Sequence, residues 1–257
     1  MSHAAALPNE GPVARPRTHA SWVRICHWLA AASFLTLAVS GFLILMVHPR
    51  LYIGEVGNDL TPALLTLPIS NNHRPGELQP TVAFSELPGG PISADRNYPI
   101  FNKNGWARSL HFLAAWAFVV VGVAYLATGI ATGHIVRDLL PRIRELAPSA
   151  AWQDLKNHLR IDFESLRARS AYNLLQKLAY TSVLFIVLPV MIATGLTMSP
   201  AITSAYPVLL DLFGGYQTAR TVHFFGFAAL VLFFIVHVAM VIATGFHRQL
   251  RAMTWGK

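Results

Sequence analysis

Residues 220–246 read RTVHFFGFAALVLFFIVHVAMVIATGF, a stretch in which Arg220 is the only Asp, Glu, Lys or Arg. A helix needs about 20 apolar residues to cross the roughly 30 Å hydrocarbon core of a bilayer, so this stretch is long enough. Backbone amide and carbonyl groups inside lipid must be satisfied within the segment, which favours a helix. The stretch therefore predicts a transmembrane helix, and this helix carries two histidines, His223 and His237.

Three more runs without Asp, Glu, Lys or Arg lie upstream, at 25–47, 109–136 and 178–200. Each is long enough to span a bilayer. The first is not a cleavable signal peptide, because its apolar stretch is too long and no small-residue cleavage site follows it. Charged residues make up 12% of the chain, against about 25% in soluble domains. The sequence thus predicts an all-α integral membrane protein built as a four-transmembrane-helix bundle.

The predicted organisation has one membrane domain with short polar ends. We expect a flexible arm at 1–20, a four-helix domain at 21–250 and a tail at 251–257. The expected transmembrane helices cover, in order, about 22–47, 106–133, 178–198 and 220–246. Pro189 is expected to bend the third helix.

Two long connections join these helices. The first, 48–105, is rich in Pro, Gly and Asn but keeps aromatic residues, so we expect an ordered cap; these aromatics include Tyr52, Phe84, Tyr98 and Phe101. Loops this long are usually functional or disordered. The second connection, 134–177, is expected to contain an amphipathic interfacial helix around 152–166.

The net charge of +8 is unevenly distributed along the chain. The connection 134–177 is the most basic segment, with Arg137, Arg142, Arg144, Lys156, Arg160, Arg167, Arg169 and Lys177. The longer connection 48–105 has only Arg50, Arg74, Arg96 and Lys103. This asymmetry predicts that both termini and 134–177 are cytoplasmic, with 48–105 on the outer side. The basic charge is thus explained by topology and by attraction to anionic lipid, and nucleic acid is not an expected partner.

The chain has a single cysteine, Cys26. One cysteine excludes an intramolecular disulfide, an iron–sulfur cluster and the covalent attachment of a c-type haem. Any redox cofactor must therefore be held by other ligands.

Four histidines lie inside the uncharged runs: His27, His111, His223 and His237. Ionisable residues at membrane depth are costly and usually face the bundle interior. His223 and His237 are 14 residues apart, which is about 21 Å along a helix and nearly the same face. One helix face can thus present a ligand to each of two cofactors stacked across the bilayer.

The up-and-down topology predicts the partner of each histidine. His27 lies one turn into the first helix and His237 lies two-thirds of the way along the last, antiparallel one, so both reach the inner depth. His111 and His223 lie near the starts of helices that enter from outside. A low-spin haem iron takes one axial nitrogen from each side, so the two pairs predict two b-type haems. Each histidine alone has another interpretation, as a hydrogen-bonded interior residue; the depth-matched set of four favours the ligands.

Two smaller regularities accompany the histidines, and each has two interpretations. Arg24, Arg108 and Arg220 precede a histidine by three residues. They either extend to lipid headgroups or form salt bridges with haem propionates. Each run also contains a hydroxyl residue followed by glycine: Ser40-Gly41, Thr128-Gly129, Thr194-Gly195 and Thr244-Gly245. These pairs serve either ordinary helix packing or the close approach of a haem.

Four elements of the sequence together resemble a known family: Arg24-Ile-Cys-His27-Trp28, Arg108-Ser-Leu-His111-Phe112, Arg220-Thr-Val-His223-Phe224 and His237. The family comprises the dihaem cytochrome b subunits of membrane-bound nickel–iron hydrogenases, formate dehydrogenases (the gamma subunit) and thiosulfate reductases, akin to bacterial b561-type cytochromes. The likeness covers roughly 20–250. It implies His27 and His237 as ligands of the inner haem and His111 and His223 as ligands of the outer one. It also implies a multi-pass protein of the bacterial inner membrane.

Family members pass electrons between an extracytoplasmic catalytic subunit and membrane quinone. The long periplasmic loop departs from the simplest family pattern. Its segment 71–75 (NNHRP) is similar to chains that accompany a periplasmic molybdopterin oxidoreductase. The resemblance therefore implies such a partner, docked on the loop, with a hydrogenase as the other possibility.

We accordingly predict an electron-transfer subunit of a membrane oxidoreductase, with quinone bound near the inner haem; His19, Arg24 and His247 are candidate quinone-site residues. Independent catalysis by side chains is not expected. One alternative is a stand-alone b561-type quinone reductase that oxidises superoxide or a small reductant. An alternative of another class is a haem-free membrane anchor or transporter, against which the depth-matched histidines and the lack of intramembrane carboxylates argue.

Overall fold

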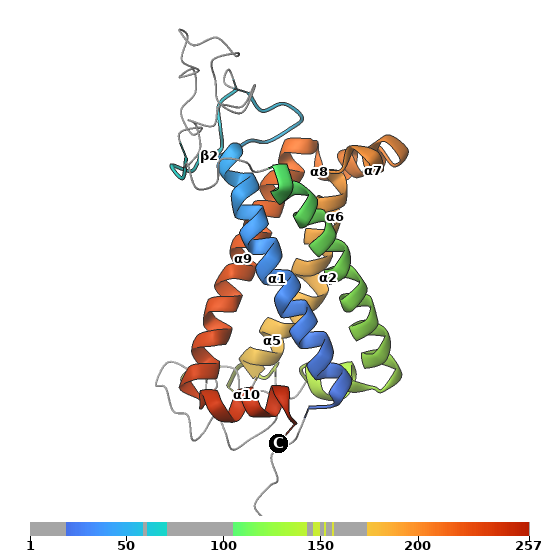
Figure 1. Cartoon of the computed structure of the whole chain (residues 1–257), viewed down its shortest axis with the longest axis vertical. Coiled ribbons are helices and arrows are strands. Elements are labelled where there is room, and N and C mark those ends of the chain that lie inside the picture. The colour runs from blue at the N-terminus through green and yellow to red at the C-terminus, as the bar shows by residue number, and fades with distance from the viewer. Residues whose placement is uncertain are drawn as a thin grey trace, which may run out of the picture.

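The computed structural model describes residues 19–58, 61–70, 105–142, 146–149, 152, 156 and 174–256. Four long helical segments dominate this part of the chain (Figure 1). They are α1 (Ser21–Val47), α2 (Gly105–Ala131), the composite segment α5–η7–α6 (Leu174–Thr197) and α9 (Tyr216–Ala243). All four are long and apolar enough to cross a membrane. The prediction of a helical bundle with four membrane-spanning helices is therefore confirmed.

The apolar side chains of these helices largely point away from the bundle. Leu113 in α2 is 68% exposed, and Leu232 in α9 is 63% exposed. In a soluble protein such surfaces would be a liability, but lipid is as apolar as these side chains. Within the described ranges, the buried apolar residues form a small cluster of Leu43, Met46 and Ala107, where α1 meets α2.

The third span changes its helical geometry near its only proline. α5 (Leu174–Ser182) passes into one π-helical turn, η7 (Val183–Val187), which is followed by α6 (Leu188–Thr197). Pro189 lies in the first turn of α6 and has no N–H to continue the regular ladder of hydrogen bonds. A π-turn is one of the recognised ways to absorb such a break.

One end of the bundle, here called the loop end, is covered by short elements. β1 (Arg50–Leu51) pairs antiparallel with β2 (Leu65–Thr66), an addition to the expected all-helical fold. α7 (Pro200–Ala205) and α8 (Val208–Phe213) lie between α6 and α9. Figure 1 shows β2, α7 and α8 at the same end.

The start of α9 is tied to the segment that follows β1. The Gln217 amide donates to the Gly54 carbonyl at 2.9 Å, and the Gly54 amide donates to Thr218 Oγ1 at 2.8 Å. Thr221 Oγ1 donates to the Tyr52 carbonyl at 2.7 Å. The described part of the connection 48–105 is therefore an ordered cap on α9, and Tyr52 is buried in it.

Gly215 is expected to be indispensable for this docking. Its φ is +112°, and a Cβ there would lie 2.5 Å from the Gly54 carbonyl carbon and oxygen. Gly215→Ala should therefore destabilise the protein by about 2 to 3 kcal/mol, through backbone strain and displacement of the Gly54 segment. Thermal unfolding in detergent measures this loss.

The neighbouring Gly214 is the matched control. Its φ is +67°, but a Cβ there would meet nothing within 4 Å. Gly214→Ala should cost only the strain of the left-handed conformation, about 1 kcal/mol. Equal losses in the two variants would show that the close approach to Gly54 contributes nothing.

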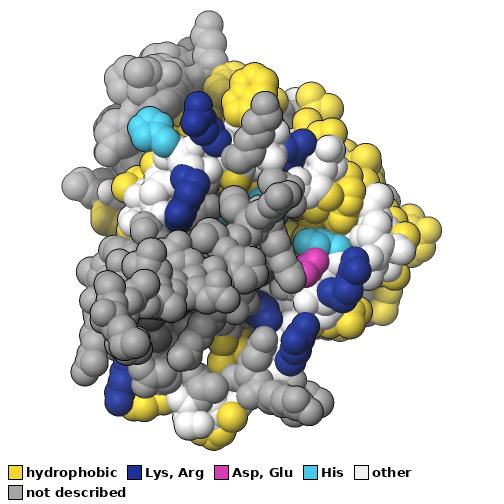
Figure 2. Space-filling model, turned by 90° about the horizontal axis from the view of Figure 1, so that it is seen from below, with side chains coloured by type: hydrophobic (Ala, Val, Ile, Leu, Met, Phe, Trp, Pro, Cys, Tyr) yellow, Lys and Arg dark blue, Asp and Glu magenta, His cyan; other side chains and the backbone are white. Residues whose placement is uncertain are grey.

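The opposite end, here called the terminal end, holds the start of α1 and the last helix. This helix, α10 (Phe246–Thr254), follows a break at Gly245. The sequence interpretation placed 251–257 in a tail, whereas 251–254 belong to α10. Trp28 Nε1 of α1 donates to the Met253 carbonyl at 3.0 Å, so α10 packs against the start of α1. Lys and Arg side chains are spread over this end face (Figure 2).

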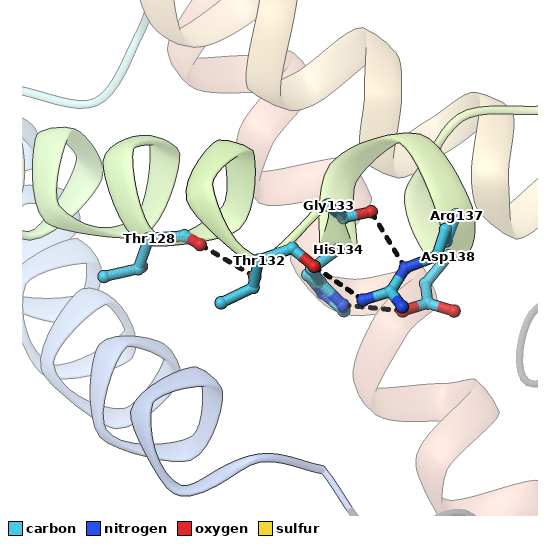
Figure 3. A network of polar contacts seen from close by, with 6 residues as sticks. All are labelled: Thr128, Thr132, Gly133, His134, Arg137 and Asp138. Atoms are coloured by element: carbon cyan, nitrogen blue, oxygen red, sulfur yellow. Dashed lines mark hydrogen bonds and ion pairs between the residues drawn. The ribbon is translucent and has the colours of Figure 1, made fainter.

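The end of α2 carries a polar network at the terminal end (Figure 3). Arg137 donates to the carbonyls of Thr132 at 2.6 Å and Gly133 at 3.3 Å, which caps the helix. His134 Nδ1 lies 2.9 Å from an Asp138 carboxylate oxygen. The π-turn η5 (Ile135–Leu139) spans this network. Most of the expected interfacial helix and most of the arm lie outside the described residues, as do residues 71–104 of the connection 48–105.

Candidate functional site

Two pairs of histidines face each other inside the bundle. His27 on α1 and His237 on α9 have ring centroids 6.3 Å apart, with ring planes inclined by 49°. They form the terminal-end pair. His111 on α2 and His223 on α9 have centroids 6.4 Å apart, with planes inclined by 63°. They form the loop-end pair, so all four histidines singled out from sequence are brought together two by two.

α9 supplies one histidine to each pair, because it runs unbroken from Tyr216 to Ala243. The two histidines are separated by 14 residues, which is about 21 Å of helix axis. The partners come from α1 for the terminal-end pair and from α2 for the loop-end pair. The pairs are therefore stacked along the length of the bundle.

Aromatic side chains surround the terminal-end pair. Phe233 stacks on His237 with centroids 5.8 Å apart, and the Tyr180 ring lies 6.3 Å from the same histidine. The Trp28 ring meets His27 edge-on at 5.2 Å. His27 Nδ1 is buried and has no hydrogen-bond partner among the described residues. Sequence reasoning missed Tyr180 and Phe233, because aromatic residues are common in membrane helices.

The loop-end pair has hydroxyl partners instead. Ser40 Oγ on α1 lies 3.0 Å from His111 Nδ1, and Thr194 Oγ1 on α6 lies 2.9 Å from His223 Nδ1. The sequence did mark both hydroxyls, as part of the hydroxyl–glycine pattern that has two interpretations, helix packing or the close approach of a haem. Their distances to histidines on other helices appear only in the folded chain.

The three arginines that precede histidines have different surroundings. Arg24 donates to Ser21 Oγ at 3.2 Å, and the Arg108 guanidinium lies 5.7 Å from the Phe112 ring centre. Arg220 donates to the carbonyls of His48 and Arg50, the latter at 3.0 Å. The regular spacing in sequence therefore does not produce one common contact.

The candidate quinone-site residues His19, Arg24 and His247 all lie at the terminal end. His19 lies just before α1, where burial and the nearby His134 and Arg24 lower its pKa. His19 therefore stays neutral at pH 7. His247 lies in α10 and is exposed. The network of His134 and Asp138 was not singled out from sequence, since both residues belong to a basic connection.

The comparisons with known proteins match nearly the whole chain. The family model described as prokaryotic cytochrome b561 matches residues 18–256. The chain is 30% identical over 223 residues to the protein of Azospira oryzae named "Putative protein-methionine-sulfoxide reductase subunit YedZ1", covering 87% of this chain and 89% of that protein. No solved structure matches the chain. The chain therefore belongs to the prokaryotic cytochrome b561 family and is a multi-pass membrane haem protein of electron transport.

Proposed function

We propose that the chain is a dihaem cytochrome b subunit that moves electrons between a redox enzyme outside the membrane and membrane quinone. The observation that carries this proposal is the pair of facing histidines at each of two depths. At centroid separations of 6.3 and 6.4 Å, one metal ion can accept a nitrogen from both rings of a pair. Neutral imidazole is a common ligand of haem iron. The residues present thus fit two b-type haems.

Each pair of histidines would hold one haem. His27 and His237 would hold one haem at the terminal end, and His111 and His223 would hold the other at the loop end. Bound haem supplies reversible one-electron chemistry. The helices keep the two sites at a fixed spacing, and their apolar faces keep water out, which governs the dielectric around each site.

The partner is proposed from the relative, whose name describes a subunit of a protein-methionine-sulfoxide reductase. We propose an extracytoplasmic oxidoreductase, of the molybdopterin type in preference to a hydrogenase. The loop 48–105 would be its docking surface, which places the loop end in the periplasm and both termini in the cytoplasm of a bacterium. This orientation agrees with the basic residues that gather in 134–177.

Haem content and quinone chemistry test the proposal together. We expect close to two b-type haems per chain in the detergent-purified protein, seen in the dithionite-reduced minus oxidised spectrum. We also expect the reduced protein to be reoxidised by a soluble quinone analogue. A folded protein without haem would make the paired histidines structural. Two haems without reoxidation by quinone would exclude quinone as the partner and keep the dihaem assignment.

A further inference from the structure

Two of the four hydroxyl–glycine pairs lie against a histidine of a neighbouring helix. Ser40-Gly41 on α1 faces His111 of α2, and Thr194-Gly195 on α6 faces His223 of α9. In both cases the hydroxyl is next to Nδ1 and the glycine is next to the adjoining ring carbon. A Cβ at Gly41 would lie 3.2 Å from His111 Cε1, and a Cβ at Gly195 would lie 3.6 Å from His223 Cε1.

The other two pairs serve the ends of their helices. Thr128 Oγ1 donates to the Ala124 carbonyl of its own helix at 2.6 Å. Gly129 packs against the Ile135 side chain, and Gly245 supplies the left-handed break before α10. The hydroxyl–glycine pattern therefore lies at helix ends in two places and contacts a histidine of a neighbouring helix in the other two.

The hydroxyl hydrogens of Ser40 and Thr194 are already used within their own helices. Ser40 Oγ donates to the Thr36 carbonyl at 2.7 Å, and Thr194 Oγ1 donates to the Val190 carbonyl at 2.7 Å. A hydroxyl has one hydrogen, so only its lone pairs remain for a ring nitrogen. Each hydroxyl oxygen must therefore accept a hydrogen bond from the Nδ1–H of the histidine that it contacts.

The hydroxyl contacts therefore fix the tautomer of both rings. With hydrogen held on Nδ1, a neutral ring has its free lone pair on Nε2.

Both hydroxyls are sealed from solvent. Ser40 and Thr194 are 0% exposed, so water does not compete for these hydrogen bonds. A hydrogen bond in such a low-dielectric site is stronger than the same bond in water. The terminal-end pair differs, because His27 Nδ1 is buried without a partner among the described residues.

We propose that Ser40 and Thr194 are positioning residues that select the Nδ1–H tautomer of the loop-end histidines and thereby lower the midpoint potential of that site. The proposal rests on the proposed function, in which these histidines bind haem iron. A hydrogen bond from Nδ1 makes Nε2 the donor atom and raises its basicity. A more basic ligand stabilises the oxidised iron, so the loop-end site is harder to reduce than it would be without the two hydroxyls.

Thr194 offers a matched pair of variants that separates the hydroxyl from packing. Thr194→Val keeps the shape and removes the hydroxyl, whereas Thr194→Ser keeps the hydroxyl and removes a methyl group. In a redox titration of the haem-loaded protein, Thr194→Val should shift one of two reduction waves to more positive potential and leave the other in place. Thr194→Ser should titrate like the unaltered protein. Ser40→Ala should shift the same wave as Thr194→Val.

Thr128→Val is the control for losing a membrane hydroxyl that follows the same sequence pattern, and both waves should stay in place. Identical behaviour of Thr194→Val and Thr194→Ser would overturn the proposal, whether both titrate normally or both lose the same haem. Loss of one haem in Thr194→Val alone, with retention in Thr194→Ser, would support it. An unaltered protein without haem would instead refute the proposed function.

Discussion

Replacing His237 by Ala is expected to lower the haem content from two to about one per chain and to leave the loop-end haem spectrum unchanged. His237 faces His27 at 6.3 Å between centroids, so its loss removes one of two ligands from the terminal-end site alone. The rings that contact His237, those of Phe233 and Tyr180, carry no imidazole nitrogen that could take its place. Pyridine haemochrome quantification with the reduced-minus-oxidised spectrum measures the outcome.

The pairing itself is tested by combining variants. His27→Ala should remove the same haem as His237→Ala, and the double variant should lose nothing more. His111→Ala and His223→Ala should instead remove the other haem, while His247→Ala, at an exposed position in α10, should keep both. Loss of the same haem in His27→Ala and His223→Ala would contradict the depth-matched pairs.

Arg220→Ala is expected to destabilise the protein by about 3 to 5 kcal/mol. The Arg220 guanidinium donates to the carbonyls of His48 and Arg50 and, at 3.0 Å, to Gln217 Oε1. Hydrogen bonds from a charged donor contribute about 1.5 to 3 kcal/mol each, and a buried carbonyl left without its donor adds a penalty. Thermal unfolding in detergent, followed by circular dichroism, measures the loss.

Two further variants distinguish this structural role from a salt bridge to a haem propionate. Gln217→Ala removes one acceptor and should cost about 1 kcal/mol. Arg220→Lys keeps the charge but lacks the planar fork that reaches several acceptors, so it should recover only part of the stability. Full stability in Arg220→Lys, with a loop-end potential that depends on the charge, would instead favour the propionate contact.

The membrane helices were predictable because lipid leaves the chain few choices. Backbone groups in hydrocarbon must bond within the segment, so an uncharged run such as 220–246 indicates a helix without help from tertiary contacts. The facing of His27 and His237 follows from helix rise and chain direction, both of which are fixed by local geometry. That these histidines ligate haem stays a prediction, which the variants above test.

Features that depend on contacts between distant segments were not predictable. Ser40 and His111 are 71 positions apart, and a serine in an apolar helix has an equally good partner in the carbonyl one turn earlier. The docking of Arg220 on His48 and Arg50 likewise needs the path of the chain after α1. α10 is a different case, because Phe246, Leu250 and Met253 do repeat at helical spacing. Its signal was masked by the longer apolar run that precedes it.

His223 and His237 belong to one unbroken helix. α9 therefore sets the directions in which the two side chains point around the helix axis, as well as the distance between the two sites. Inserting a single residue between them would lengthen the spacing by only about 1.5 Å but would turn one ring by about 100° away from its partner. A seven-residue insertion, close to two full turns, would nearly restore these directions and separate the sites by about 10 Å more. The length of this segment is thus constrained by angle more tightly than by distance.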